Sequence, residues 1–305
     1  MAITANDVKK LREMTGVGMM DCKKALTEAE GNMDKAVEIL REKGLAASQK
    51  KAGRIAAEGM AYAAVIDGVG VVVEVNAETD FVAKNDKFVD FVKGVAATVA
   101  ANKPADLDAL MACKYNGTEL TVTEQQQEMV LVIGENIKVR RFAFYTEGVS
   151  VPYIHAGGKI GVLVNLETDL TAEQVETAGK DVAMQIAALN PRFWDKSQVD
   201  QATLDEEKKI MMVQMANDPK MASKPEQVRE KIVMGKLNKF YEENCLLQQD
   251  FVKDGSMTVE QYVASAAKAL GGTITFKAAV RFEKGEGIEK KQENFAEEIA
   301  KQLGK

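Results

Sequence analysis

Histidine is almost absent from this 305-residue sequence, since His155 is the only one. A catalytic triad would have to use this single imidazole, and no HExxH metal motif occurs. The three cysteines, Cys22, Cys113 and Cys245, are far apart, and none belongs to a CxxC pair. We therefore expect buried or incidental thiols rather than a zinc site or another metal centre.

The sequence also lacks a phosphate-binding motif and any long apolar run. No GxxxxGK[ST] loop occurs, and residues 68–70 (GVG) precede a predicted strand, whereas a dinucleotide-binding loop follows one. No apolar run approaches the roughly 18 residues that a membrane-spanning helix needs. Residues 1–4 lead directly into a helical pattern rather than a signal peptide, which predicts a cytoplasmic protein.

An excess of positive charge is missing as well. The net charge of −6 argues against an extended nucleic-acid-binding face. Residues 46–59 carry Lys50, Lys51 and Arg54 without aromatic neighbours, so a solvated linker is favoured there over a nucleic-acid site. No cofactor is indicated. These exclusions favour a binding protein over an enzyme, although catalysis by paired carboxylates stays open.

The most informative stretch runs from Gly70 to Asp86. Its β-branched run over residues 71–75 predicts a buried strand, which ends in the polar residues 76–80. Phe81 then stands before a helical stretch that begins near Asn85. A turn at the edge of a sheet commonly carries function, because the scaffold fixes it and leaves it exposed.

The same pattern recurs downstream. Residues 161–170 read GVLVNLETDL, and the earlier copy reads GVVVEVNAETDF. Each copy has a glycine, an apolar run and Glu-Thr-Asp followed by one large apolar residue, and each precedes an amphipathic helix. Two copies are too few for a solenoid, so we predict two related α+β subdomains.

The remaining patterns predict the domain organisation of an α+β protein. Three short helices, the third ended by Gly44, form an N-terminal unit, and two charged helices form an antiparallel hairpin inserted in the second subdomain. Phe295, Ile299 and Leu303 mark a C-terminal helix. The predicted domains are 1–55 (helical unit and linker), 56–148 (first subdomain), 149–192 with 245–283 (second subdomain), 193–244 (hairpin) and 284–305 (C-terminal helix).

Several surfaces have two interpretations. The hairpin helices either pack only on each other or contact a partner or a second copy through an apolar seam. The C-terminal helix either covers its own core or docks on a partner. For Phe81, Met19 and Met20, residue type alone favours a buried core position, although methionine also suits adaptable binding surfaces.

At five places the sequence resembles bacterial elongation factors Ts. The matching segments are residues 15–26 (TGVGMMDCKKAL), 79–84 (TDFVAK), 134–141 (GENIKVRR), His155 with 161–164 (GVLV), and 285–290 (GEGIEK). They occur in family order over nearly the whole chain, and together they are highly specific.

The resemblance implies a guanine-nucleotide exchange factor in translation elongation, without chemistry or a cofactor of its own. The implied partner is elongation factor Tu, GDP-bound or nucleotide-free, with no direct nucleic-acid or membrane contact. The implied fold has an N-terminal three-helix domain similar to ubiquitin-associated (UBA) domains and a duplicated α+β core. An inserted helical hairpin, which is a candidate homodimer contact, and a C-terminal module complete it.

The resemblance also implies the binding residues. In similar proteins a Thr-Asp-Phe-Val turn intrudes into the nucleotide domain of the partner and disturbs its magnesium site. That role falls here to Thr79, Asp80, Phe81 and Val82. The implied secondary contacts are Met19, Met20, Lys23 and His155.

One position departs from the family pattern. Glu78 stands where the family often has glutamine, which adds a negative charge beside the turn. An alternative function, a ubiquitin-type adaptor that uses only the N-terminal helices, would leave the duplicated core unexplained.

Overall fold

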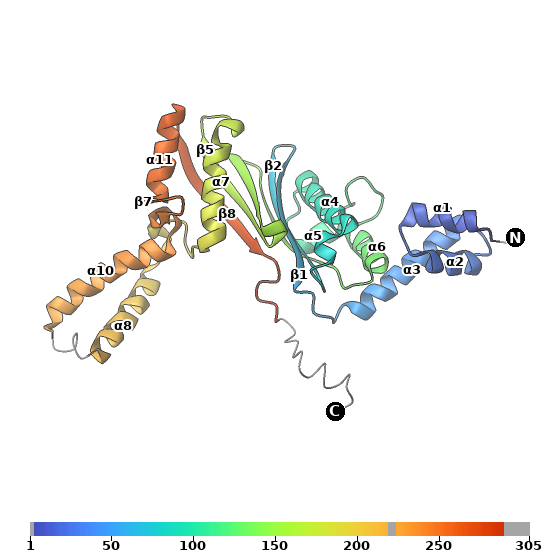
Figure 1. The fold of residues 1–305 in the computed structure, drawn as a ribbon, viewed down its shortest axis with the longest axis horizontal. Coiled ribbons are helices and arrows are strands. Elements are labelled where there is room, and N and C mark those ends of the chain that lie inside the picture. Colours follow the sequence, from blue (N-terminus) through green and yellow to red (C-terminus); the bar gives the residue numbers. More distant parts are fainter. Residues whose placement is uncertain (1–2, 219–223, 290–305) are drawn as a thin grey trace. The chain divides into compact units, whose positions relative to one another are not determined.

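The computed structural model describes residues 3–218 and 224–289 of the chain (Figure 1). Helices and strands are mixed along the chain, which confirms the predicted α+β class. The chain divides into two compact units. Unit 1 contains Met1–Phe144, Ile154–Gly161 and Phe282–Lys305, and unit 2 contains Tyr145–Tyr153 and Val162–Arg281. The predicted C-terminal helix around Phe295 lies outside the described residues.

Unit 1 begins with three helices, α1 (Ala5–Thr15), α2 (Met19–Glu28) and α3 (Met33–Lys51). A capping box of Thr4 and Asp7 starts α1 by satisfying free backbone N–H groups. Apolar residues at helical spacing close a small core. Its buried members are Val8, Leu11, Val17, Cys22, Ala25, Leu26, Ala29, Ala36 and Leu40.

The prediction that Gly44 ends the third helix is wrong, since α3 continues to Lys51. A Cβ atom at Gly44 would lie 3.2 Å from the backbone oxygen of Gln127 on α6, the last helix before β3. The glycine therefore permits a close approach of two helices instead of ending one. An ion pair of Arg41 with Glu128, 3.7 Å apart, crosses the same contact.

The first sheet has the order β1-β2-β3, with β1 (Glu58–Ile66), β2 (Val69–Ala77) and β3 (Lys138–Tyr145). Strands β1 and β2 pair antiparallel through a two-residue turn at Asp67 and Gly68, both with positive φ, as the Asp-Gly pair predicts. Every residue of β2 is buried.

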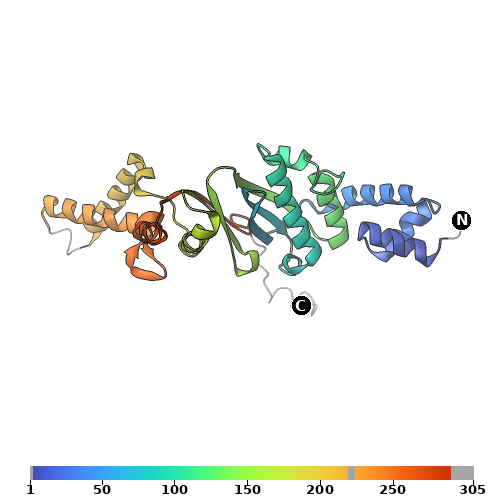
Figure 2. The same ribbon diagram turned by 90° about the horizontal axis from the view of Figure 1, so that it is seen from above.

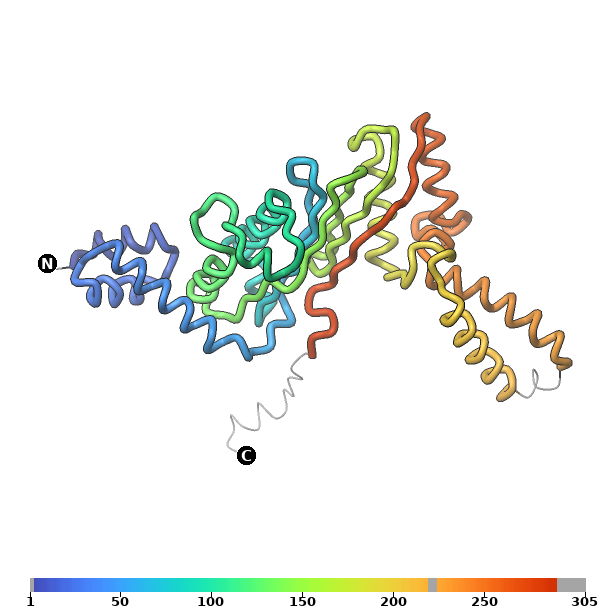
Figure 3. Tube along the Cα trace, turned by 180° about the vertical axis from the view of Figure 1, so that it is seen from behind, coloured from blue at the N-terminus to red at the C-terminus, as the bar shows by residue number. Residues whose placement is uncertain are grey.

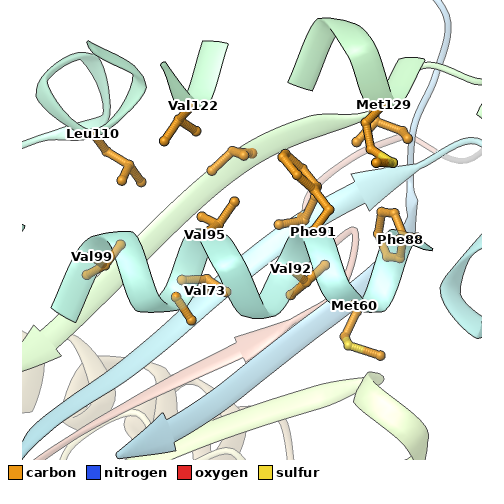
Figure 4. Close-up of a cluster of buried hydrophobic side chains, with 14 of the residues drawn as sticks. Met60, Val73, Phe88, Phe91, Val92, Val95, Val99, Leu110, Val122 and Met129 are labelled. Atoms are coloured by element: carbon orange, nitrogen blue, oxygen red, sulfur yellow. The ribbon is translucent and has the colours of Figure 1, made fainter. Parts of the chain in front are cut away.

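Three helices follow β2 in unit 1, α4 (Asp86–Asn102), α5 (Leu107–Ala112) and α6 (Val122–Ile133). One face of α4 packs into the core of the sheet, as its apolar spacing predicts (Figure 4). Its fully buried side chains on this face include Phe88, Phe91, Val92, Val95 and Val99. This core fixes both β2 and the start of α4, the two elements that flank the candidate site.

The second sheet has the order β4-β5-β8, with β4 (Val149–His155), β5 (Ile160–Thr168) and β8 (Ile274–Glu283). Strands β5 and β8 lie side by side in this sheet, although they are far apart in the sequence (Figure 3). Helix α7 (Ala172–Leu189) follows β5 as α4 follows β2. Both sheets thus consist of a hairpin and one later strand.

Two helices interrupt the second half of the chain, α8 (Gln201–Asn217) and α10 (Glu226–Asn244), and they lie side by side (Figure 2). Met215, Val233 and Leu237 are buried, as predicted for a contact between the helices. Ile210, Val213, Val228 and Met234 remain more than 40% exposed. Self-packing therefore accounts for only part of the apolar surface.

Three elements of unit 2 were not predicted from the sequence. They are β6 (Asp250–Phe251), β7 (Asp254–Thr258) and α11 (Val259–Leu270). The side chain of Gln185, fully buried on α7, donates to the backbone oxygen of Asp250 and accepts from the N–H of Val252. A remote glutamine thus holds the β6–β7 hairpin, which local sequence patterns do not reveal.

The described helices are those of residues 3–218 and 224–289. None of them combines the length and the apolar character that a membrane-spanning helix requires.

Candidate functional site

The turn between β2 and α4 contains Thr79, Asp80, Phe81 and Val82, here called the TDFV turn. The buried strand β2 holds one end of it. At the other end, Val82 is buried and begins a short 3₁₀ helix, Val82–Lys84. Asn85 then caps α4 by accepting a hydrogen bond from the N–H of Lys87 at 3.0 Å. Rigid elements therefore fix the turn on both sides.

The middle of the turn faces solvent. The Phe81 side chain is 80% exposed, so the interpretation of Phe81 as a core aromatic is wrong. Asp80 is exposed too, and its carboxylate makes no hydrogen bond or ion pair with any residue that the structure describes. A large exposed aromatic beside an unengaged carboxylate is unusual for a residue pair with a purely structural role.

Thr79 points into the protein instead. Its N–H and its hydroxyl both donate to the carboxylate of Glu135, at 3.0 and 2.7 Å. Glu135 lies in the loop between α6 and β3. Of the four predicted residues, Asp80 and Phe81 are therefore presented outward, whereas Thr79 and Val82 anchor the turn.

Glu78, directly before the TDFV turn, also bonds to the α6–β3 loop, but here the loop supplies the donor and Glu78 the acceptor. Its carboxylate accepts from the N–H of Asn136 at 2.6 Å and lies 3.5 Å from the Arg54 guanidinium. The Asn136 amide donates to the backbone oxygen of Arg54 at 2.8 Å. The added negative charge at Glu78 is thus engaged within the protein, and Arg54 of the predicted linker takes part in this contact.

A shallow groove lies next to the exposed phenylalanine. Its lining residues are Phe81, Val82, Lys84, Asn85, Asp86, Lys87, Val132 and Ile133. The ammonium group of Lys87 donates to the backbone oxygen of Gly16 at 3.0 Å. This bond joins the turn between α1 and α2 to the start of α4, within unit 1.

The predicted secondary contacts are all on the surface. Met19 and Met20 begin α2 and are 54% and 66% exposed, so their interpretation as core residues is wrong. Lys23 is exposed on the same helix. His155 is exposed at the end of β4, in a different sheet from the strand that precedes Phe81. Met14 on α1 is also exposed, at 58%, and was missed, because a single methionine at helical spacing resembles a core residue.

Two of the cysteines are buried thiols. Cys22 on α2 is fully buried, and burial raises the pKa of its thiol. Burial also raises the pKa of Cys245, to about 11. Both thiols therefore stay protonated near neutral pH, and a nucleophilic role is disfavoured. No group of three or more histidine, cysteine or acidic side chains that could hold a metal ion occurs in residues 3–218 or 224–289.

Two further segments that carry the family resemblance, residues 134–141 and 285–290, meet at a buried carboxylate. Glu74 on β2 is fully buried and accepts from Arg140, Arg141 and the N–H of Gly285, at 2.9, 2.5 and 2.8 Å. Burial raises the pKa of Glu74, but these hydrogen bonds outweigh it and hold the pKa below its ordinary value. The segment after β8 is thereby attached to the first sheet, so these motifs have a structural role.

The second copy of the turn is built differently. The Thr168 hydroxyl donates to the backbone oxygen of Thr273, and the Asp169 carboxylate accepts from the N–H and hydroxyl of Thr273, at 2.6 and 3.0 Å. Leu170 is half-buried and packs closely against Gly272. This turn leaves no large apolar side chain fully exposed.

Comparisons with known proteins agree on one family. The family model for elongation factor TS matches residues 78–286. An elongation factor Ts of Clostridium kluyveri is 50% identical over 306 residues, covering 99% of both chains. Proteins of the same name from Clostridium botulinum and Syntrophotalea carbinolica are each 48% identical, over 307 and 303 residues, with at least 98% of each chain covered.

Proposed function

The chain belongs to the elongation factor Ts family, and we propose that it is a guanine-nucleotide exchange factor for elongation factor Tu. In this proposal the chain binds the GDP-bound factor in the bacterial cytoplasm and promotes GDP release, so that GTP can bind. It performs no covalent chemistry of its own. The observation that carries the proposal is the exposed Phe81 on a turn fixed at both ends.

The TDFV turn supplies the means. Phe81 offers a rigid apolar body that gains free energy when it inserts between packed elements of a partner. Asp80 brings a carboxylate without an internal partner among the described residues, so it is available for groups near the magnesium site of the partner. Magnesium screens the nucleotide phosphates, and disturbing its coordination lowers the affinity for nucleotide.

Exchange of this kind is a coupling between two ligands of the same partner. If binding of the chain weakens GDP affinity by some factor, GDP weakens binding of the chain by the same factor. Each tenfold of weakening corresponds to about 1.4 kcal/mol of coupling free energy. The protein therefore needs contacts away from the nucleotide site that hold the partner while the turn acts.

We assign that holding role to Met19, Met20 and Lys23 on α2, with His155 as a further contact. Their exposure supports the assignment, and methionine adapts well to a partner surface. The hydrogen bond between Lys87 and Gly16 fixes the turn before α2 relative to α4.

We also propose the finer architecture. Residues 1–55 form a UBA-like domain and linker, 56–148 and 149–192 with 245–283 form a duplicated core, and 193–244 form an inserted hairpin. A C-terminal module follows from 284. The exposed apolar residues Ile210, Val213 and Met234 support a contact of the hairpin with a second copy of the chain.

The experiment that tests the function is release of labelled GDP from elongation factor Tu at fixed magnesium concentration, with and without the protein. Substoichiometric amounts should accelerate release, because an exchange factor is not consumed. If folded protein leaves the release rate unchanged at saturating concentration, the proposed function is wrong.

A further inference from the structure

On the basis of this function, we propose that Glu135 is a positioning residue for the TDFV turn. Thr79 then serves to hold the turn rather than to touch the partner. The consequence is that the α6–β3 loop determines how Asp80 and Phe81 are presented.

The first support is that both hydrogen-bond donors of Thr79 are used by one carboxylate. The N–H and the hydroxyl of Thr79 donate to the two oxygens of Glu135 at 3.0 and 2.7 Å. Bonds to an ionised carboxylate are stronger than bonds between neutral groups. This geometry fixes the backbone and the side-chain rotamer of the residue directly before Asp80.

The second support is that the two loops exchange bonds in both directions. Glu135 accepts from the backbone N–H of Thr79, and Glu78 accepts from the backbone N–H of Asn136 at 2.6 Å. Asn136 is buried and holds Arg54 as well. The loop that supplies Glu135 is therefore itself fixed, and it can transmit this rigidity to the turn.

The third support is that the bonds from the α6–β3 loop hold the two residues directly before Asp80. Ala77 and Val82 are buried and anchored by the core, whereas Asp80 and Phe81 are exposed. Only Glu78 and Thr79 lie between the buried end of β2 and Asp80, and both are engaged by the α6–β3 loop. Pre-orienting an exposed anchor reduces the ordering entropy that is lost when the anchor inserts in a partner.

The test measures GDP release from elongation factor Tu as a function of the concentration of the variants. We expect Glu135→Ala and Thr79→Val to lower the maximal release rate by about tenfold. The half-saturating concentration should change by less than about twofold, because the surfaces that hold the partner are unaltered. Thr79→Ser keeps the hydroxyl donor and should retain most of the maximal rate.

Two controls separate positioning from a general loss of structure. Glu38→Ala removes an exposed carboxylate on α3 and should leave both kinetic parameters unchanged. The double variant Glu135→Ala/Thr79→Val should be no slower than either single variant, since the two residues act through one contact. In a Phe81→Ala background, removal of Glu135 should have little further effect on the maximal rate.

Several outcomes would overturn the proposal. It is wrong if Glu135→Ala and Thr79→Val keep the wild-type maximal rate, or if the losses of Glu135→Ala and Phe81→Ala multiply. If Glu135→Ala does not fold, the comparison of Thr79→Val with Thr79→Ser decides. If wild-type protein itself fails to accelerate release, the proposed function fails, and that result differs from a failure confined to the variants.

Discussion

The two Glu-Thr-Asp turns of the molecule have nearly the same sequence and different roles for their last two residues. After β5, Asp169 is bonded to Thr273 directly before β8, and Leu170 packs on Gly272. After β2, the corresponding Asp80 has no side-chain partner among the described residues, and Phe81 is 80% exposed.

The difference comes from where each turn is anchored. The turn after β5 is held through both Thr168 and Asp169, which bond to Thr273 directly before β8 of the same sheet. The turn after β2 is held through Thr79, by the carboxylate of Glu135, and its aspartate bonds to none of the described residues. Because Glu135 binds the threonine and not the aspartate, Asp80 and Phe81 are left without a structural role. A duplicated pattern thereby yields one structural turn and one turn that is available to a partner.

The largest effects are expected when the apolar residue after each Glu-Thr-Asp is truncated to alanine. Phe81→Ala should lower the maximal rate of GDP release by about thirtyfold, the loss expected for an interface residue worth about 2 kcal/mol. Its melting temperature should stay close to wild type, because the side chain is exposed. Leu170→Ala should do the opposite, with unchanged exchange and a loss of about 1–3 kcal/mol in stability.

Stopped-flow release of labelled GDP measures the exchange rate of both variants, and thermal denaturation measures their stability. If Leu170→Ala slowed release as much as Phe81→Ala does, the two turns would not have separate roles.

The packing of the second turn can be tested at Gly272. A Cβ atom there would lie 2.6 Å from the Leu170 side chain and 2.7 Å from the Asp169 carboxylate. Gly272→Ala should therefore lower the free energy of unfolding by about 1 kcal/mol or more. Gly235→Ala on α10 is the matched control, since nothing lies within 4 Å of its Cβ position. The control should raise stability by about 0.5–1 kcal/mol, the gain of alanine over glycine in a helix. Chemical denaturation of both variants gives the comparison, and equal stability of the two would contradict it.

The aspartates can be compared through pH. Hydrogen bonds from the backbone and side chain of Thr273 hold the pKa of Asp169 below its ordinary value of 3.8. A depressed pKa stabilises the fold above pH 3.8, and this stabilisation is lost as the pH falls through the lower, folded-state value. Asp169→Asn should therefore lower the melting temperature at pH 7, and its difference from wild type should shrink toward pH 3.

Asp80→Asn is the control for that experiment. It removes no side-chain hydrogen bond among the described residues, so it should leave the melting temperature at pH 7 unchanged. A decrease as large as that of Asp169→Asn would show that both aspartates hold their turns.

Local sequence patterns predict much of the scaffold that carries the turns. The β-branched run before residue 76 and the Asp-Gly pair determine a buried strand and its hairpin, because both depend on neighbouring residues alone. The apolar spacing from Phe88 to Val99 likewise predicts α4. Gly44 shows the limit of this reasoning, since glycine serves equally at a helix end and at a close helix contact. The deciding neighbour, Gln127, is remote in sequence.

The candidate site depends more heavily on remote contacts. Residue type alone places Phe81 in a core, and family resemblance is what marks it as a binding residue. Resemblance also marks residues 134–137 without stating what they do. Glu135 and Thr79 are 56 positions apart, and no periodic pattern joins them. Their contact arises because β3, which follows the α6–β3 loop, lies beside β2 in the sheet, and only the three-dimensional structure provides this.

The smallest effect is expected for Glu78→Gln, at the position where the turn departs from the family pattern. Its carboxylate accepts from the N–H of Asn136 at 2.6 Å, and the amide oxygen of a glutamine can accept the same bond. The interaction with Arg54, 3.5 Å away and half exposed, contributes little because solvent screens it. Glu78→Gln should therefore change the maximal rate of GDP release by less than about twofold.

Glu78→Ala removes the acceptor and should slow release toward the level of Thr79→Val, because it breaks the second hydrogen bond between the turn region and the α6–β3 loop. If Gln and Ala at this position were equally active, the bond from Asn136 would have no part in presenting Phe81, and the difference between the two turns would rest on Glu135 alone.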